Sequence, residues 1–187
     1  MIVIGIGANL PHPQFGAPRR TCGAALAMLE DRAIHIIKRA TWYSTAPVLA
    51  DHRSKKQEDQ PWYVNGAVAV ASDLDAHGLL KVLLDVEAAF GRVRSIADAP
   101  RTLDLDIITF DEQVLNENGL NIPHPRMHER AFVLYPLRDL APEWHHPVMH
   151  TAISGLIEAL PADQSFAAMP DANGLFGTEW RENEGVG

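Results

Sequence analysis

One alternating run, residues 102–110 (Thr-Leu-Asp-Leu-Asp-Ile-Ile-Thr-Phe), limits what this chain can fold into more than any other stretch. Read as a β-strand, the run directs alternate apolar residues to one face, and these are Leu103, Leu105 and Ile107. Asp104 and Asp106 point to the opposite face, together with Ile108 and Phe110. We therefore expect one face in a hydrophobic core and a second, partly covered face that carries two carboxylates.

The spacing of the two aspartates suits a magnesium site. Carboxylates one side-chain period apart have Cβ atoms roughly 7 Å apart. Mg²⁺ takes oxygen ligands, and water and substrate phosphates usually complete its coordination. Arginines and one histidine flank the pair in the sequence, and these are Arg92, Arg94, Arg101, His124, Arg126 and Arg130. Because arginine forks match phosphate geometry, we expect a metal–polyphosphate site. The alternative is an aspartate pair on the solvated face of an antiparallel strand.

The overall composition is that of an ordinary globular protein, with 47% apolar and 21% charged residues among 187. The formal net charge of −8 argues against a general binder of nucleic acids or membrane surfaces, which is usually basic. Cys22 is the single cysteine, which excludes an internal disulfide and suits a reducing cytosol. No apolar run reaches the length of a membrane span. We expect a cytoplasmic protein, a monomer or small homo-oligomer, whose partners are small molecules.

Hydrophobic periodicity gives the order of the elements. Strands are expected over residues 2–7, 35–45, 61–71 and 102–110, and helices over 19–31 and 75–90. This order is typical of an α+β, ferredoxin-like βαββαβ fold with a mainly antiparallel sheet and helices packed on it. Further elements are expected at 114–115 (strand), 128–140 and 151–160 (helices). We expect a single domain over residues 1–160 and a weakly ordered tail over 161–187.

Two segments outside the expected elements bear on function. Residues 46–61 form a polar stretch without periodicity, and long loops in compact domains often act as lids. Lys55 and Lys56 in this stretch can be interpreted as phosphate contacts or as a solvated charge run. Gly5-Ile-Gly7 is half of a dinucleotide-binding fingerprint, but the third glycine is missing and prolines follow, which disfavours a Rossmann fold.

Several strings within residues 1–147 carry a resemblance to one known protein family. They are Ile-Gly-Ala-Asn-Leu at 6–10, Tyr-Val-Asn-Gly-Ala at 63–67, Gly-Arg-Val-Arg at 91–94, Pro-Arg-Thr-Leu-Asp-Leu-Asp-Ile at 100–107, Pro-His-Pro at 123–125 and Arg-Ala-Phe at 130–132. Together they resemble the 6-hydroxymethyl-7,8-dihydropterin pyrophosphokinase family of folate biosynthesis. The string at 100–106 is highly specific for that family.

The resemblance implies transfer of pyrophosphate from ATP to the hydroxyl of 6-hydroxymethyl-7,8-dihydropterin, which leaves AMP and the pterin diphosphate. It implies ATP as co-substrate and two Mg²⁺ ions held by Asp104 and Asp106. The residues implied in catalysis are Arg92, Arg101, Asp104 and Asp106. Those implied in nucleotide binding are Glu87, Arg92, Arg101, His124 and Arg130. Those implied in pterin binding are Thr45, Pro47, Tyr63, Asn65, Asp104 and Phe132.

Some of these residues admit other interpretations. Glu87 can orient an arginine, contact the nucleotide or be solvated, and Asn65 can be a polar residue at the start of a strand. His124 and His128 have the spacing of a zinc pair on a helix. The prolines on both sides of His124 oppose a regular helix there, and no cysteine or third ligand accompanies the two histidines.

Residues 95–101 depart from the family pattern. This stretch lacks the usual loop arginine and tryptophan, and Ala99 replaces a glycine. Three alternatives follow: a related enzyme that acts on a modified pterin, a pterin- or nucleotide-binding protein without turnover, and a nucleotidyl transferase that uses the same two carboxylates.

Overall fold

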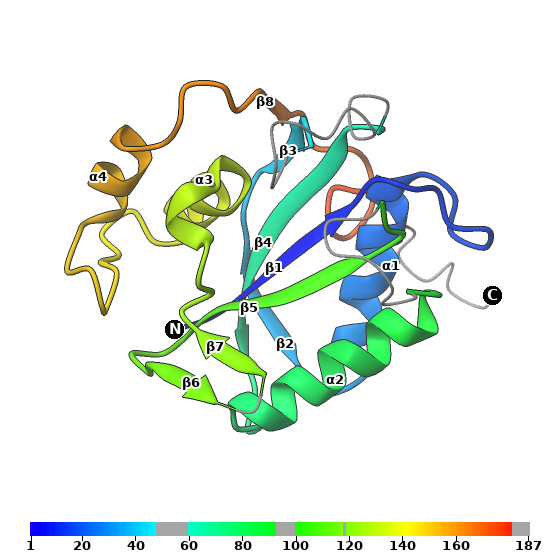
Figure 1. Cartoon of the computed structure of the whole chain (residues 1–187). Coiled ribbons are helices and arrows are strands. Elements are labelled where there is room, and N and C mark those ends of the chain that lie inside the picture. The colour runs from blue at the N-terminus through cyan, green and yellow to red at the C-terminus, as the bar shows by residue number, and fades with distance from the viewer. Residues whose placement is uncertain (48–59, 93–99, 118, 181–187) are drawn as a thin grey trace.

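A computed structural model describes residues 1–47, 60–92, 100–117 and 119–180 (Figure 1). Its main sheet has the order β5-β1-β4-β3-β8, and β2 pairs with a different part of β4 from the one that pairs with β3. Every strand pair in it is antiparallel. The strands are β1 (Ile2–Ala8), β2 (His35–Arg39), β3 (Trp42–Thr45), β4 (Tyr63–Ala71), β5 (Asp104–Phe110) and β8 (Phe166–Met169). A separate hairpin joins β6 (Leu115–Glu117) to β7 (Leu120–Ile122).

Helices cover both faces of the sheet, as Figure 1 shows. On one face lie α1 (Pro18–Glu30) and α2 (Ala76–Ala89), and on the other lie α3 (Ala131–Leu140) and α4 (Ile153–Glu158). A short 3-10 turn, η2 (Met127–Glu129), precedes α3. The order β1-α1-β2/β3-β4-α2-β5 confirms the ferredoxin-like α+β prediction, with the second strand divided into two.

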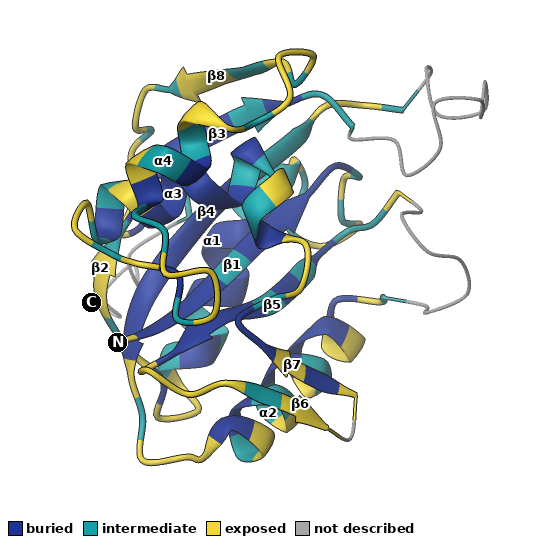
Figure 2. Cartoon of the chain, turned by 60° about the vertical axis from the view of Figure 1, so that its left-hand side comes forward, coloured by how far each residue is buried: buried dark blue, intermediate teal, exposed yellow. Residues whose placement is uncertain are grey.

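Two hydrophobic cores lie on opposite faces of the sheet. Ile4 and Leu105 belong to the core beneath α1 and α2, whereas Val3 and Leu134 belong to the core beneath α3. This division follows from the strand period of two, which sends neighbouring residues to opposite faces. Buried residues concentrate in the central strands β1, β4 and β5 (Figure 2).

A β-bulge in β5 corrects one sequence prediction. Val3 pairs with Thr109 and Ile4 pairs with Ile107, so Ile108 is an extra residue in β5. The extra residue reverses the alternation that follows it. Phe110 therefore lies in the core beneath α1 and α2, and not on the aspartate face as predicted, while Ile108 lies on the aspartate side.

Other element boundaries also differ from the prediction. The strand expected over 35–45 is interrupted after Arg39, because β2 pairs with the end of β4 around Val70 and β3 pairs with its beginning around Val64. The helix expected over 128–140 is η2 followed by α3, and the one expected over 151–160 is the shorter α4.

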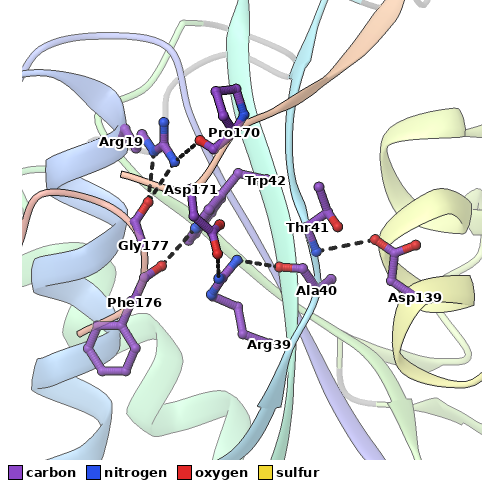
Figure 3. A network of polar contacts seen from close by, with 10 residues as sticks. All are labelled: Arg19, Arg39, Ala40, Thr41, Trp42, Asp139, Pro170, Asp171, Phe176 and Gly177. Atoms are coloured by element: carbon purple, nitrogen blue, oxygen red, sulfur yellow. Dashed lines mark hydrogen bonds and ion pairs between the residues drawn. The ribbon is translucent and has the colours of Figure 1, made fainter. Parts of the chain in front are cut away.

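The segment after residue 160 is built into the fold, contrary to the expected weakly ordered tail. Strand β8 pairs with β3. Trp42 Nε1 donates to the carbonyl of Phe176 at 2.9 Å, and Arg19 Nε donates to the carbonyl of Gly177 at 3.0 Å (Figure 3). Arg39 forms an ion pair of 2.7 Å with Asp171. Because strand pairing and tertiary hydrogen bonds hold residues 166–177, composition alone was a poor guide here. Residues 181–187 lie outside the described part.

None of the helices in the described residues is long and apolar enough to cross a membrane. Cys22 is completely buried in α1, and burial raises the pKa of its thiol to about 12. The thiol is therefore neutral and packs as a small apolar side chain.

Candidate active site

The two aspartates lie beside glycines of the neighbouring strand. Asp104 pairs with Gly7 of β1, and Asp106 pairs with Gly5. A Cβ at Gly7 would lie 2.5 Å from Asn65 Oδ1. Glycine at this position therefore lets the Asn65 side chain lie directly over β1, next to Asp104.

Two arginines hold the carboxylate of Asp104. Arg92 donates to its Oδ1, and Arg101 donates to its Oδ2 at 2.6 Å. Arg92 also donates to Glu87 Oε1, which accepts a second hydrogen bond of 2.8 Å from the backbone amide of Leu105. Glu87 is 1% exposed, so the solvated interpretation of this residue is wrong. Its carboxylate orients Arg92 against Asp104.

Asp106 carries a strongly perturbed carboxyl group. Burial, and then the negative charges of Asp104 and Glu87, raise its pKa from 3.8 to about 7, against the opposing effect of Arg92 and Arg130. A negative charge nearby disfavours ionisation of a buried carboxyl group. A divalent cation would stabilise the ionised form of Asp106.

A cavity at the beginning of β4 brings together the residues expected to bind the pterin. Its lining includes Thr45, Pro47, Tyr63, Asn65, Asp104 and Phe132. Arg101 and Arg130 also line it. Asn65 Nδ2 donates a 2.7 Å hydrogen bond to the hydroxyl of Thr45 on the adjacent strand. The guanidinium of Arg130 lies 5.3 Å from the ring centroid of Phe132. We call this the pterin-side cavity.

A second cavity borders Asp106 and not Asp104. It is lined by Asp106, His124 and Arg126 together with residues of β7. Burial and the charges of Arg130 and Arg126 lower the pKa of His124 to about 4, so its imidazole is neutral near pH 7. The backbone amide of Arg126 donates to His124 Nδ1 at 3.3 Å. Nε2 is then the N–H donor, since one ring nitrogen accepts and a neutral imidazole has one proton. We call this the nucleotide-side cavity.

A third hollow borders both carboxylates. Asp104 and Asp106 both line it, together with Gly7, Asn65 and Phe132. Asp104 thus borders the pterin-side cavity and Asp106 borders the nucleotide-side cavity, with a shared space between them. This arrangement can hold an acceptor beside Asp104 and a polyphosphate beside Asp106.

The structure gathers most, but not all, of the predicted positions. Arg94, Lys55, Lys56 and the altered loop at 95–99 lie outside the described residues, as does most of the expected lid. His128 lies 3.7 Å from the neighbouring carboxylate of Glu129. Within the described ranges no three histidine, cysteine or acidic side chains form a group that could hold a metal ion, so the zinc interpretation finds no third ligand.

Asn9, which the sequence offers only as part of the string at 6–10, positions a residue of the site. It is 2% exposed, and its Oδ1 accepts a 2.8 Å hydrogen bond from the backbone amide of Arg101. Its Nδ2 donates to the carbonyl of Pro61 at 3.2 Å, two residues before Tyr63. The sequence contained one signal, a buried strand followed at once by a side chain that both donates and accepts hydrogen bonds.

The sequence of this chain matches those of known proteins. The sequence profile of the 7,8-dihydro-6-hydroxymethylpterin-pyrophosphokinase (HPPK) family matches residues 3–142. A 2-amino-4-hydroxy-6-hydroxymethyldihydropteridine pyrophosphokinase of Pseudomonas aeruginosa is 51% identical over 147 residues, which are 78% of this chain and 83% of the relative. One of Synechocystis is 36% identical over 174 residues, which are 92% of this chain and 81% of the relative.

A solved structure supports the fold. The wild-type HPPK-DHPS of Plasmodium falciparum superposes with a TM-score of 0.62 at 15% identity. The match covers 84% of this chain but only 44% of that longer chain, so it concerns one part of the Plasmodium protein. On its sequence profile, its relatives and its fold, this chain belongs to the 7,8-dihydro-6-hydroxymethylpterin-pyrophosphokinase family.

Proposed function

We propose that this chain transfers the terminal diphosphate of ATP to the hydroxyl of 6-hydroxymethyl-7,8-dihydropterin, a step of folate biosynthesis. The observation that carries the proposal is the position of the two aspartates. Asp104 borders a cavity with an amide and aromatic side chains, and Asp106 borders a cavity with a neutral histidine and an arginine.

The pterin-side cavity suits a flat heterocycle with an amide-like edge. Tyr63 and Phe132 can pack against the two faces of such a ring, since aromatic rings prefer offset stacking. Asn65 carries both a donor and an acceptor in one side chain and can pair with the ring's polar edge. Its hydrogen bond to Thr45 fixes the plane of the amide before the substrate arrives.

The nucleotide would enter from the side of His124 and Arg126. Arg92, Arg101 and Arg130 converge on the acidic pair and can bind phosphate oxygens as negative charge moves during transfer. The hydroxyl oxygen bonds to the β-phosphorus, the bond from that phosphorus to the α,β-bridging oxygen breaks, and AMP leaves while the hydroxyl proton is released. Such transfers depend mainly on positioning and charge stabilisation.

The residues present fit magnesium. Asp104 and Asp106 supply hard oxygen ligands. Burial and the negative charges of Asp104 and Glu87 raise the pKa of Asp106, so a bound cation would stabilise its ionised form. Two carboxylates alone are too few for a closed metal cage, but they suit Mg²⁺, which is commonly completed by water and substrate phosphates. We propose two ions, which would neutralise the triphosphate and lower the pKa of the attacking hydroxyl.

The nature of the nucleotide product tests the proposal. Incubation of the protein with Mg²⁺, ATP and 6-hydroxymethyl-7,8-dihydropterin should yield AMP and the pterin diphosphate in equal amounts. Formation of ADP, or release of pyrophosphate, would assign a different transfer. Calorimetric binding of the pterin without any AMP would identify a binding protein. Asp104→Ala and Asp106→Ala should each lower kcat by orders of magnitude while the circular dichroism spectrum stays unchanged.

A further inference from the structure

A residue far from the aspartates in the sequence holds one wall of the pterin-side cavity. The side-chain amide of Gln164 donates to the carbonyl of Glu129 at 2.7 Å, and its Oε1 accepts from the amide of Ala131 at 2.9 Å. These two backbone groups lie immediately before and after Arg130. Gln164 therefore fixes the backbone of a residue that lines the cavity, without lining that cavity itself.

The contact with Ala131 has a specific role at the start of α3. The first amides of a helix have no partner within the helix, and a side chain just before the helix usually accepts from them. At α3 that position is Arg130, which does not cap the helix with its side chain. Gln164 supplies the missing acceptor from a distant part of the chain, and it thereby sets the direction in which α3 presents Phe132 to the cavity.

The residues next to Gln164 hold the opposite wall. The carbonyl of Ser165 accepts a 2.9 Å hydrogen bond from the amide of Ala46. Phe166 pairs with Thr45 across β8 and β3. The centroid of its ring lies 4.2 Å from the ring centroid of Tyr135 in α3. Both walls of the cavity are thus attached to one short segment, residues 164–166, which is itself anchored in the sheet.

We infer that Gln164 is a positioning residue for the transfer reaction: it holds Arg130 and Phe132 against the Thr45–Pro47 wall so that nucleotide and pterin are aligned. This inference rests on the proposed function for its kinetic test. Gln164 acts through hydrogen bonds to the backbone, so its loss should weaken both substrates' binding without removing any group that contacts them.

The test compares Gln164→Met, which keeps the side-chain length and removes both hydrogen bonds, with Gln164→Glu, which keeps an acceptor for Ala131 and loses the donor. Asp163→Asn is the control, because Asp163 is the exposed neighbour of Gln164 and lines, with Gln164 and Arg130, one groove on the protein surface. KM and kcat are measured for ATP and the pterin well below the unfolding temperature. The affinity for α,β-methylene-ATP, which cannot undergo the cleavage, is measured by calorimetry.

For Gln164→Met we expect an increase of about tenfold in both KM values and in the dissociation constant of the analogue, the scale of one or two lost hydrogen bonds. Gln164→Glu should lie between this variant and the wild type, and Asp163→Asn should match the wild type. In an Arg130→Ala background, Gln164→Met should change the analogue affinity less than twofold, since its effect passes through Arg130. Amide exchange at Ala131 should accelerate.

Wild-type KM values and analogue affinity in Gln164→Met would overturn the inference, as would an effect that adds fully to that of Arg130→Ala. Should Gln164→Met fail to fold, unchanged affinity in Gln164→Glu overturns it in the same way. A wild-type protein that makes no AMP would contradict the proposed function instead. The analogue affinity and the Ala131 exchange rate would then still decide the role of Gln164.

Discussion

The side chain of Asn9 accepts a 2.8 Å hydrogen bond from the backbone amide of Arg101. The backbone amides of Asn9 and its neighbour Leu10 in turn donate to the carbonyl of Arg101, at 3.1 and 3.2 Å. The two residues that follow β1 thus hold both backbone polar groups of Arg101, while its guanidinium contacts Asp104. The first strand therefore positions an arginine more than ninety residues later.

Asn9→Ala should lower both stability and turnover. The substitution leaves the Arg101 amide and the Pro61 carbonyl without their partner, which costs about 1–3 kcal/mol for a buried group. Urea unfolding should show this loss, and kcat should fall at least several-fold because Arg101 is less well fixed. The exposed substitution Gln14→Ala serves as the control and should leave both quantities unchanged. Wild-type kcat in a folded Asn9→Ala protein would contradict the positioning of Arg101 by Asn9.

Gly7→Ala should impair pterin binding selectively. A Cβ at this position would lie 2.5 Å from Asn65 Oδ1, so the Asn65 side chain must move away from its hydrogen bond with Thr45. We expect KM for the pterin to rise about tenfold or more, with a much smaller change in KM for ATP. Gly155→Ala in α4 is the matched control, since its added Cβ would meet only a methyl group of Thr151, at 3.3 Å. An equal rise in both KM values would mean that the change spreads beyond Asn65.

Asp106 should make the stability of the metal-free protein depend on pH. Its pKa is raised in the folded state, so the stabilisation is fully present below 3.8 and is lost as the pH rises through about 7. Urea unfolding should therefore show a less stable protein at pH 8 than at pH 5, and Asp106→Asn should reduce this difference. By the same linkage, Mg²⁺ in the presence of a nonhydrolysable ATP analogue should bind more weakly below pH 7. A pH dependence that Asp106→Asn leaves unchanged would assign the effect to another group.

Phe176→Ala should destabilise the protein by about 3–5 kcal/mol, because the ring is 7% exposed and lies in the core beneath α1 and α2. Leu175→Ala, one residue earlier and 58% exposed, should be nearly neutral. The midpoint of denaturant unfolding measures both. Equal, small effects would show that residues 175–176 behave as the weakly ordered tail that the composition indicated.

Several parts of this protein followed from local sequence patterns. The alternation of leucine and aspartate in residues 103–107 was sufficient to orient Asp104 and Asp106 correctly, because side-chain direction in a strand is a local property. The periodicity of α2 and the order of the elements were sufficient for the ferredoxin-like fold. The same rule failed at Phe110, since a bulge depends on the register with β1 and leaves no mark in the alternation itself.

What the sequence determined by itself was the chemistry of the acidic strand and the fold class, since both depend on residue type and spacing along one segment. Tertiary structure decided which side chains form hydrogen bonds around that strand. Glu87 accepts from Arg92, Asn9 accepts from the backbone amide of Arg101, and Gln164 bonds to the backbone on both sides of Arg130. These contacts join residues whose separation along the chain is unrelated to their distance in space. A buried polar side chain needs a partner, but only the packing of strands and helices determines which one it finds.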